Sequence, residues 1–556
     1  MRIGLYHGYE LTGSGSNEYT RYLARSFVDA GHEVHIICRE ENPENIPYIT
    51  HAYAWKRDGT VETLFMRPIQ QPVHQNGAPR CFLHQLPHGD VRPVYLTDKQ
   101  REGNVKSFIS LSDDELDEYH QLNERLLTKI LSRYQLDVLH ANHLVYQPVA
   151  ALQACKITRT PLVIFPHGSS IEYTVKPDER YQRLALRGLL ESTGLIVGNR
   201  EVRERILDLY AEHRETILAK TQIVGVGVDT SLFKPVERAE RHRSIQQLIA
   251  TNGGGGKSPE MTEELHGRLR AGDIEATRDY WTRYDHSLPD ADLNDHLKRI
   301  PWDQNVLLFV GSLTVGKGLQ SLITALPKVL YEHPQTHLII VGAGAYREVL
   351  EALVYATSSS NQNLLLQLCA KGKDLDRNEL TGPWEDVRVF LNNPSNLSFI
   401  LKNGENIDKH VHFLGRLDHS RLRYLFPCAD LAVFPSIVAE AYPLVLMESL
   451  SNGVLPVVSY FSGFKDGVDD LEPFLGESLT EKMKIPADIQ VRVERIASSL
   501  NGLLADESFK KLGPRLRQIA VENYDWKLKA SQMVSAYRSL IQRQSISPAD
   551  FIARRS

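Results

Sequence analysis

Short apolar segments alternate with helical segments twice along this 556-residue chain. In the first series, strand-like segments fall at 3–6, 33–38, 137–140, 161–165 and 194–197. Helical patterns lie between them, over 17–30, 113–134, 147–154 and 201–210. Strands that alternate with helices form a parallel sheet covered on both faces. The alternation therefore predicts an α/β chain with a doubly wound sheet.

A second series begins after residue 300, with strand-like segments at 306–310, 337–341, 411–414, 431–434 and 455–459. We therefore predict two Rossmann-like domains, over 1–235 and 303–520, with chemistry beyond the carboxyl ends of the strands. Three stretches do not follow the pattern. They are an irregular insertion at about 41–110, a polar insertion or linker over 236–302, and an insertion at about 355–408.

Charge and cysteine usage exclude several classes of protein. The net charge is −5 and the pI is near 6.5, so no global positive field draws the chain to nucleic acid. Five scattered cysteines without CxxC spacing argue against a zinc site and against a disulfide framework. The chain opens on a strand-like segment instead of a signal peptide, and it lacks a long apolar run, so we expect a cytoplasmic location. Peripheral contact with a membrane stays open.

The segment 428–463 carries the most chemistry. A buried strand at 431–434 ends at Pro435, and Glu440 follows on the connecting loop. We place Pro443 in the first turn of a helix over 444–450, with Glu448 on that helix. The first helical amides, at Leu444 and Val445, lack intrahelical partners and form an anion site.

Two carboxylates that flank such a helix start can bind hydroxyl groups on both sides of a diphosphate. The alternative interpretation makes Glu440 a solvated loop residue and Glu448 a charge on a helix face. The strand–loop–helix–strand context favours the first interpretation.

This segment resembles the E-x7-E motif of retaining GT-B glycosyltransferases, in the GT4-like family (glycosyl transferases group 1) that includes glycogen, sucrose and phosphatidylinositol mannosyl-transferring enzymes. Glu440 and Glu448 occupy the two glutamate positions. The resemblance implies a GT-B fold in which Glu440 contacts the transferred sugar and Glu448 the ribose of the donor. It also implies that a helix within 521–556 crosses back to the first domain.

Other motifs agree with the resemblance. Gly15 lies in the glycine-containing connection after the first strand, where backbone can approach a diphosphate. His167 ends another strand and matches a histidine near the reacting sugar, and Lys317 matches the lysine that neutralises the leaving diphosphate. Where the family usually has an arginine, five residues before this lysine, the chain has Ser312; Arg416 is a candidate to replace that charge.

Two motifs imitate other sites. The run 253–258 (GGGGKS) imitates a P-loop, but Thr251 stands where the first glycine is required and no strand precedes it. Asp374 and Asp376 imitate a metal-binding DxD, and we expect them in a solvated loop of the insertion. We expect no metal site, no essential metal and no cofactor.

The sequence thus predicts a retaining transferase that uses a nucleoside-diphosphate sugar, with a uridine donor favoured. The acceptor would be a carbohydrate, a lipid or a small molecule, contacted from the 41–110 and 240–300 insertions. Two alternatives stay open. One is another nucleotide-sugar enzyme, of the epimerase or phosphorylase type, and the other is a catalytically weak partner subunit that binds nucleotide sugars.

Overall fold

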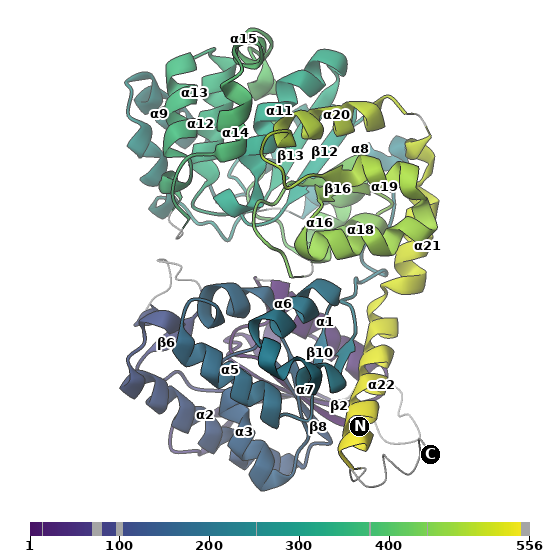
Figure 1. The fold of residues 1–556 in the computed structure, drawn as a ribbon. Helices are drawn as coiled ribbons and strands as arrows, with labels where there is room; N and C mark the ends of the chain where they lie inside the picture. Colours follow the sequence, from purple (N-terminus) through teal and green to yellow (C-terminus); the bar gives the residue numbers. More distant parts are fainter. Residues whose placement is uncertain are drawn as a thin grey trace. The chain divides into compact units, whose positions relative to one another are not determined.

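The computed structural model describes residues 1–13, 15–68, 80–95, 104–251, 253–376, 380–441, 443–506 and 508–545. The chain folds into two compact units, coloured by sequence in Figure 1. The first unit comprises Met1–Gly227 and Tyr524–Ser556, and the second comprises Val228–Asn523. The sequence predicts a first domain that ends at 235 and a second over 303–520, whereas the second unit begins at Val228 and includes the segment 236–302.

The first unit is built on a nine-stranded sheet with the order β11-β10-β9-β8-β1-β2-β5-β3-β4. The predicted strands are all present in it. They are β1 (Arg2–Tyr6), β2 (Glu33–Cys38), β8 (Val138–Asn142), β9 (Leu162–Phe165) and β10 (Gly194–Val197). They pair in parallel, and β11 (Thr221–Ile223) extends the sheet beyond β10. Their side chains are almost continuously buried, as in a parallel sheet that is covered on both faces.

The helices of this unit follow their sequence signals closely. The predicted helices are α1 (Gly15–Asp29), α2 (Asp113–Tyr134), α3 (Gln147–Thr158) and α6 (Arg200–Leu209). A capping box starts α2, in which the Glu115 amide donates to Ser112 Oγ and the Ser112 amide donates back to the Glu115 carboxylate. This reciprocal pair fixes the start of the helix.

The prediction of an irregular insertion at about 41–110 is wrong for most of the segment that the structure describes. The segment contributes β3 (His51–Trp55), β4 (Val61–Met66) and β5 (Cys81–Gln85) to the main sheet. β5 pairs in parallel with β2, and β3 and β4 form an antiparallel hairpin at the sheet edge. Most side chains of β4 are exposed, so the apolar pattern that reveals a buried strand is missing there. Residues 69–79 and 96–103 lie outside the described part.

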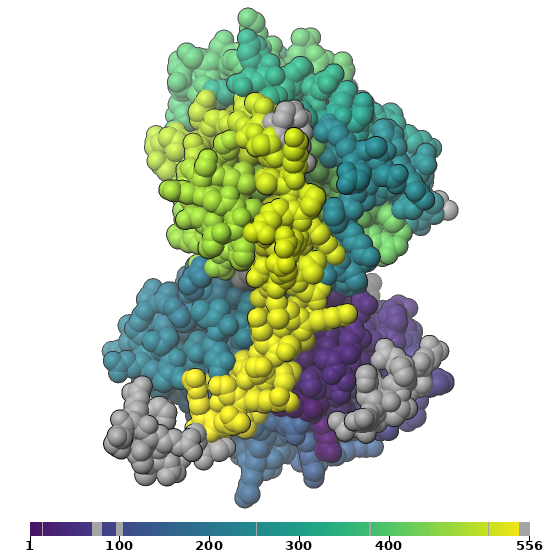
Figure 2. Space-filling model, turned by 90° about the vertical axis from the view of Figure 1, so that its right-hand side faces the viewer, coloured from purple at the N-terminus to yellow at the C-terminus, as the bar shows by residue number. Residues whose placement is uncertain are grey.

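The C-terminal helix α22 (Trp526–Ser545) belongs to the first unit, as the resemblance implies. It packs against α1, and Figure 2 shows this yellow segment lying against the purple N-terminal residues. Tyr537 on α22 forms a 2.7 Å hydrogen bond with Nδ1 of His140 on β8, and both side chains are buried. The end of the chain is thereby joined to the central strands of the sheet.

The second unit has a six-stranded parallel sheet with the order β14-β13-β12-β15-β16-β17. Its predicted strands are β12 (Asn305–Val310), β13 (Thr336–Val341), β14 (Val411–Phe413), β15 (Leu431–Phe434) and β16 (Leu455–Ser459). The insertion at about 355–408 is mainly helical and packs on this unit. Its complete helices are α13 (Gln362–Lys371), α14 (Glu385–Leu391) and α15 (Pro394–Asn403).

The segment 236–302 is not a linker but part of the second unit. It contains α8 (Arg241–Ala250), α9 (Pro259–Arg270) and α10 (Leu293–Arg299). Lys257, from the run that imitates a P-loop, is buried and forms ion pairs with Glu348 and Glu351 of α12 (Arg347–Ser358). The lysine is therefore a structural cation.

No helix in the described ranges is long and apolar enough to cross a membrane.

We predict that Lys257→Met destabilises the second unit by about 3–5 kcal/mol, because it removes a buried cation from Glu348 and leaves Glu351 with Arg347 alone. Lys298→Met is the matched control, since Lys298 forms an exposed ion pair with Asp295, and it should change stability by about 0.5 kcal/mol or less. Urea unfolding of both variants measures the difference. Equal stability of the two variants would contradict the structural role of Lys257.

A second prediction concerns the stability of the first unit at low pH, which depends on the buried His140. Burial lowers the pKa of His140 to about 3, although its hydrogen bond with Asn142 opposes the shift. An unfolded histidine titrates near 6.5, so the unfolded chain binds the proton first, and stability present above pH 6.5 is lost as the pH falls toward 3. Between pH 7 and 5 this histidine alone should lower the free energy of unfolding of the first unit by about 2 kcal/mol.

The variant His140→Gln cannot titrate, so its unfolding free energy should fall by about 2 kcal/mol less over the same pH interval. Urea titrations at the two pH values provide the comparison. The same pH dependence in both proteins would show that His140 is not the titrating group.

Candidate active site

The polar loops of the second unit gather at one edge of its sheet. All six strands are parallel, so the segments that follow β12, β13, β14, β15 and β16 leave from the same side. Lys317 follows β12, Arg416 follows β14, and Glu440 follows β15. The edge therefore collects the residues that the sequence predicts to act together.

The loop after β12 lies directly against the loop after β15. Gly318 has a φ of +72°, and a Cβ atom there would lie 1.8 Å from the carbonyl oxygen of Pro435. The amide of Ile437 donates to the carbonyl of Gly316 at 2.8 Å. Only glycine allows this approach at position 318, and the approach brings Lys317 within reach of the loop that carries Glu440.

Lys317 and Glu440 form the central contact of the site. The Lys317 ammonium lies 2.5 Å from Glu440 Oε1, and the hydroxyl of Ser436 donates to the same oxygen at 2.8 Å. The Glu440 amide donates to Ser462 Oγ at 2.9 Å. Glu440 is held at both its carboxylate and its backbone, which does not fit the alternative of a solvated loop residue.

These partners also determine the charge of Glu440. Burial alone would raise the pKa of its carboxyl, but the ammonium of Lys317 and the hydroxyl of Ser436 lower that pKa below the ordinary value. The side chain is consequently an anion at neutral pH and accepts hydrogen bonds. It can bind hydroxyl groups of a ligand, while the lysine, with three donors, can bind a further anion.

The helix that follows Glu440 is α17 (Leu444–Ser451). Pro443 caps this helix, with φ −77° and ψ 108°, so it lies just before the first turn instead of within it. Leu444 and Val445, both half-buried, form the first turn. The amides of a first turn lack intrahelical acceptors and attract anions. Tyr442 lies outside the described residues.

Glu448 is buried within α17, and its Oε1 lies 3.3 Å from Nε2 of His419. His419 begins α16 (His419–Leu425), which follows β14 and Arg416 along the chain. The ring of Phe233 packs edge-on against His419. Glu448 therefore connects α17 to the segment after β14, which does not fit the alternative of a charge on a solvated helix face.

The two remaining predicted residues of this edge differ in their surroundings. Ser312, in the position of the expected arginine, is exposed. Arg416 is half-buried, and its guanidinium has no hydrogen bond or ion pair within the described part of the chain, but it interacts electrostatically with the carboxylate of Asp285. β12 and β14 are two strands apart, roughly 10 Å at the usual strand spacing. An arginine side chain spans much of that distance, so the Arg416 guanidinium can reach a ligand bound at this edge.

The predicted residues of the first unit lie at the carboxyl end of its own sheet. Gly15 is the first residue of α1, and a Cβ atom there would meet nothing within 4 Å, so the glycine is not required by packing. Ser14 lies outside the described residues. His167 follows β9, and its Nε2 lies 3.1 Å from Oδ1 of Asn142. Burial lowers the pKa of His167 well below its usual value, and the nearby His7 and His140 lower it further.

Several polar residues around these positions were not predicted. In the first unit, His7 and Asn142 share a hydrogen bond of 3.3 Å and surround His167 together with His143. In the second unit, Ser436 and Ser462 bind Glu440. Each follows a predicted strand, as do His143 and His167, so the ends of parallel strands were the available signal.

The glycines after β13 were missed as well. A Cβ atom at Gly342 would lie 1.8 Å from the carbonyl oxygen of Gly311, and one at Gly344 would lie 2.0 Å from that of Leu313. Both positions therefore require the absence of a side chain. The sequence Val341–Gly–Ala–Gly after a predicted strand was the signal for this close approach.

The two imitating motifs have structural roles. The Asp376 carboxylate accepts from the amide of Val315 at 2.8 Å, and its side chain is buried, so the expectation of a solvated loop is wrong for this residue. Asp374 accepts from the amide of Gly382. Among the described residues, no group of three or more His, Cys, Asp or Glu side chains could hold a metal ion.

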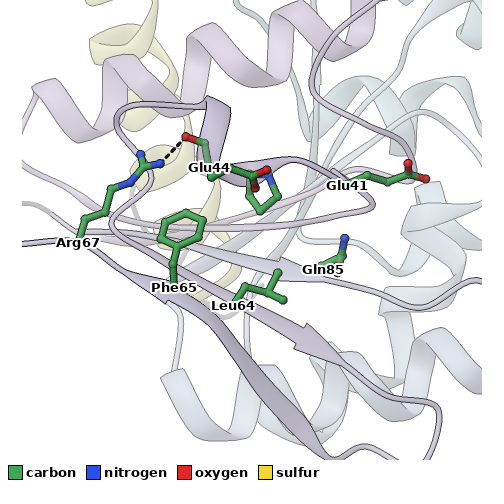
Figure 3. Close-up of a pocket in the computed structure, with 7 residues that line it drawn as sticks. Glu41, Glu44, Leu64, Phe65, Arg67 and Gln85 are labelled. Carbon is green, nitrogen blue, oxygen red and sulfur yellow. Dashed lines mark hydrogen bonds between the residues drawn. The ribbon is translucent and has the colours of Figure 1, made fainter.

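A pocket of about 530 Å³ lies in the first unit, beside the β3–β4 hairpin (Figure 3). Its labelled lining residues are Glu41, Glu44, Leu64, Phe65, Arg67 and Gln85. Arg67 donates to the backbone carbonyls of Glu44 and Ile46, so its guanidinium is used within the fold. The pocket contains none of the predicted site residues.

Comparison with known families follows the same division of the chain. The model of the glycosyl transferase 4-like domain matches residues 14–218, and that of glycosyl transferases group 1 matches residues 293–373 and 400–510. The second match includes Lys317, Arg416, Glu440 and Glu448. Residues 219–292 lie outside both matches.

Curated relatives agree with these families over part of their length. The chain is 26% identical over 237 residues to an uncharacterized glycosyltransferase of Methanocaldococcus jannaschii, which covers 42% of this chain and 45% of that protein. It is 23% identical over 241 residues to a phosphatidyl-myo-inositol mannosyltransferase of Mycobacterium tuberculosis, covering 43% and 48%. The matched region therefore spans less than half the length of either relative.

Solved structures share the fold over nearly the whole chain. Sucrose-phosphate synthase from Thermosynechococcus elongatus is 16% identical with a TM-score of 0.51, covering 98% of this chain and 99% of that one. The catalytic domain of starch synthase IV from Arabidopsis thaliana, bound to ADP and acarbose, is 11% identical with a TM-score of 0.54, covering 97% and 99%. These likenesses indicate the two-domain GT-B fold. With the family matches to both halves, they place this chain in the GT4-like family of GT-B glycosyltransferases.

Proposed function

We propose that this protein transfers a sugar from a nucleoside-diphosphate sugar to an acceptor, with retention of configuration at the anomeric carbon. The observation that carries the proposal is the Lys317–Glu440 pair beside the start of α17. A cation, an ionised carboxylate and helical amides meet at one sheet edge. Together they match the needs of a diphosphate attached to a hydroxyl-rich ring.

The residues divide the work by their chemistry. Lys317 and the amides of Leu444 and Val445 would bind the diphosphate and stabilise its charge as the sugar leaves. Glu440 would accept hydrogen bonds from sugar hydroxyls, and Glu448 would accept from the ribose. The described site offers no separate carboxylate beside Glu440 to act as nucleophile, so the leaving phosphate would help to deprotonate the acceptor.

In the first unit, His167 and the turn at Gly15 would contact the acceptor. The low pKa of His167 keeps its ring neutral, so it can donate one hydrogen bond and accept another. The acceptor would be a carbohydrate, a lipid or a small molecule. No metal or other cofactor enters this proposal.

A uridine donor is the form of the proposal that we favour. Among the solved structures that share the fold, the Anabaena protein HepE is described in complex with UDP; it is 13% identical with a TM-score of 0.52, covering 97% of this chain and all of that one. A thermal-shift series with UDP, GDP and ADP tests the base, because a ligand of the native state raises the melting temperature. A shift with UDP alone supports the proposal, and no shift with any of the three contradicts it.

Turnover separates the alternatives. Release of UDP from a UDP-sugar that requires an acceptor supports a transferase, whereas acceptor-independent isomerisation of the sugar would indicate an epimerase and phosphate-dependent release a phosphorylase. Nucleotide binding without any turnover would favour the partner-subunit alternative, which the exposed Ser312 in the arginine position makes worth testing.

We predict that Glu448→Gln weakens UDP binding by about tenfold or more, because it removes a charge-assisted hydrogen bond worth about 1.5–3 kcal/mol. Glu332→Gln, an exposed change at the end of α11 (Leu319–Glu332), is the control and should leave the affinity unchanged. Isothermal titration calorimetry measures both. Equal affinities would exclude Glu448 from the site.

We also predict that Lys317→Ala lowers kcat by about 10²–10³-fold, since it removes a preorganised cation from the developing diphosphate charge. The control is Lys328→Ala, whose side chain pairs with Glu494 and should be dispensable for turnover. Steady-state release of UDP gives kcat for both. An unchanged kcat in the Lys317 variant would defeat the assigned role.

A further inference from the structure

The segment 285–291, which no matched family range covers, is joined by hydrogen bonds to the loops of the candidate site. On one side, the amides of Gly255 and Gly256 donate to the carbonyl of Pro289, at 3.1 and 2.8 Å. On the other side, the Asp290 amide donates to the Leu414 carbonyl at 3.1 Å, and the Arg416 amide donates to Leu288 at 3.4 Å. The glycine run that imitates a P-loop thus supports the turn that carries Arg416.

That turn depends on glycine at position 415 and on its close contact with Asp290. Gly415 has a φ of +72°, and a Cβ atom there would lie 2.7 Å from both the amide nitrogen and Oδ1 of Asp290. The amide of Gly342 donates to the Gly415 carbonyl at 2.9 Å. Asp290, the Gly415–Arg416 turn and the glycine loop after β13 therefore form one continuous layer.

Asp290 is itself fixed by buried charges. Both of its carboxylate oxygens lie 2.6 Å from the guanidinium of Arg347, which also binds Glu351 at 2.8 Å. All three side chains are buried. Burial raises the pKa of Asp290 and Arg347 opposes that shift, and the two-pronged geometry is that of a carboxylate bound to a guanidinium.

The far end of the same turn is also held. His419, three residues after Arg416, lies beside the buried Glu448. Arg416 is thus presented between two fixed points, Asp290 on one side and the His419–Glu448 contact on the other. A long side chain loses less freedom on binding a ligand when its backbone is already fixed.

We infer that Asp290 is a positioning residue for Arg416. Through Asp290, the segment 236–302 sets the affinity of this protein for its donor nucleotide. The inference rests on the proposed function, because it takes a nucleoside diphosphate as the ligand of Arg416. Asp290 would not contact the ligand. It would hold the Gly415–Arg416 turn so that the Arg416 guanidinium reaches the nucleotide.

Glu351 provides a matched control inside the same charge network. Like Asp290, Glu351 forms an ion pair with Arg347 and is buried; it also pairs with Lys257. Among the described residues, no hydrogen bond joins Glu351 to the 414–416 turn. Asp290→Asn and Glu351→Gln each neutralise one buried carboxylate of Arg347. Only Asp290 has a carboxylate oxygen packed against Gly415, so only the first change lies at the turn.

The test is a double-mutant cycle in the full-length chain, with UDP affinity measured by calorimetry. Asp290→Asn should weaken UDP binding by about tenfold, and Glu351→Gln by less than about twofold. In an Arg416→Ala background, Asp290→Asn should add less than about twofold, because its effect acts through the missing side chain. The inference would be overturned if the losses of UDP affinity from Asp290→Asn and Arg416→Ala multiplied independently. Equal losses of affinity in Asp290→Asn and Glu351→Gln would also overturn it.

If Asp290→Asn does not fold, Gly256→Ala displaces the segment without changing a charge. Its Cβ atom would lie 2.8 Å from the carbonyl oxygen of Pro289, whereas one at Gly267 of α9 would meet only the tip of Arg270, at 4.0 Å. Gly256→Ala should weaken UDP binding about tenfold and Gly267→Ala should not. Equal affinity in these two variants overturns the inference. If the unaltered chain binds none of UDP, GDP and ADP, the proposed function is contradicted, and not only this inference.

Discussion

The contact between Lys317 and Glu440 is the constraint around which the second unit arranges its polar loops. A lysine and a glutamate from different strand ends meet at 2.5 Å because Gly318 lets one loop approach the backbone of the other. Ser436 and Ser462 then hold the glutamate in place. The two side chains are 28% and 20% exposed, so the pair stays accessible to a ligand. A charged pair fixed in this way needs little rearrangement when a diphosphate arrives, which is the condition for strong electrostatic stabilisation.

Around this pair, buried polar contacts join neighbouring elements, as apolar packing does in other parts of the fold. Glu448 reaches His419, Arg347 reaches Asp290, and Asp376 reaches the amide of Val315. Each contact joins a loop at the sheet edge to another element of the same unit. Such buried polar groups cost free energy unless they are fully paired, and they specify one arrangement when they are. Contacts with neighbouring helices and loops therefore position the site, in addition to the strands that carry its residues.

Much of the fold could be predicted from local signals, and the limits of those signals are instructive. The helix Asp113–Tyr134 and the strands Leu431–Phe434 and Leu455–Ser459 have the bounds that the sequence predicts, and in the structure a capping box fixes the start of the helix. The hairpin of β3 and β4 was not, since its exposed edge strand has no buried face to produce a pattern. The sequence of 236–302 suggests an insertion or linker, because the residues that order it, Glu348, Glu351 and Arg347, lie far away in the sequence.

The same distinction holds for the site. The order of strands and helices predicts that Lys317, Glu440 and the start of α17 lie at one sheet edge, because parallel strands bring their ends to one edge. The choice of Lys317 as a site residue rests on the family resemblance. Their partners did not follow, since Ser462 and His419 are ordinary residues whose roles depend on contacts across the sheet. The predicted place of Pro443 differs from the observed one by one residue, because Pro443 precedes the first turn of the helix instead of lying in it.

A crystal structure of the chain with UDP bound would test the central claim most directly. We predict that the diphosphate lies between the Lys317 ammonium and the first amides of α17, with the ribose near Glu448. A diphosphate bound instead at the glycine run before Lys257, or at the pocket beside Arg67, would contradict it.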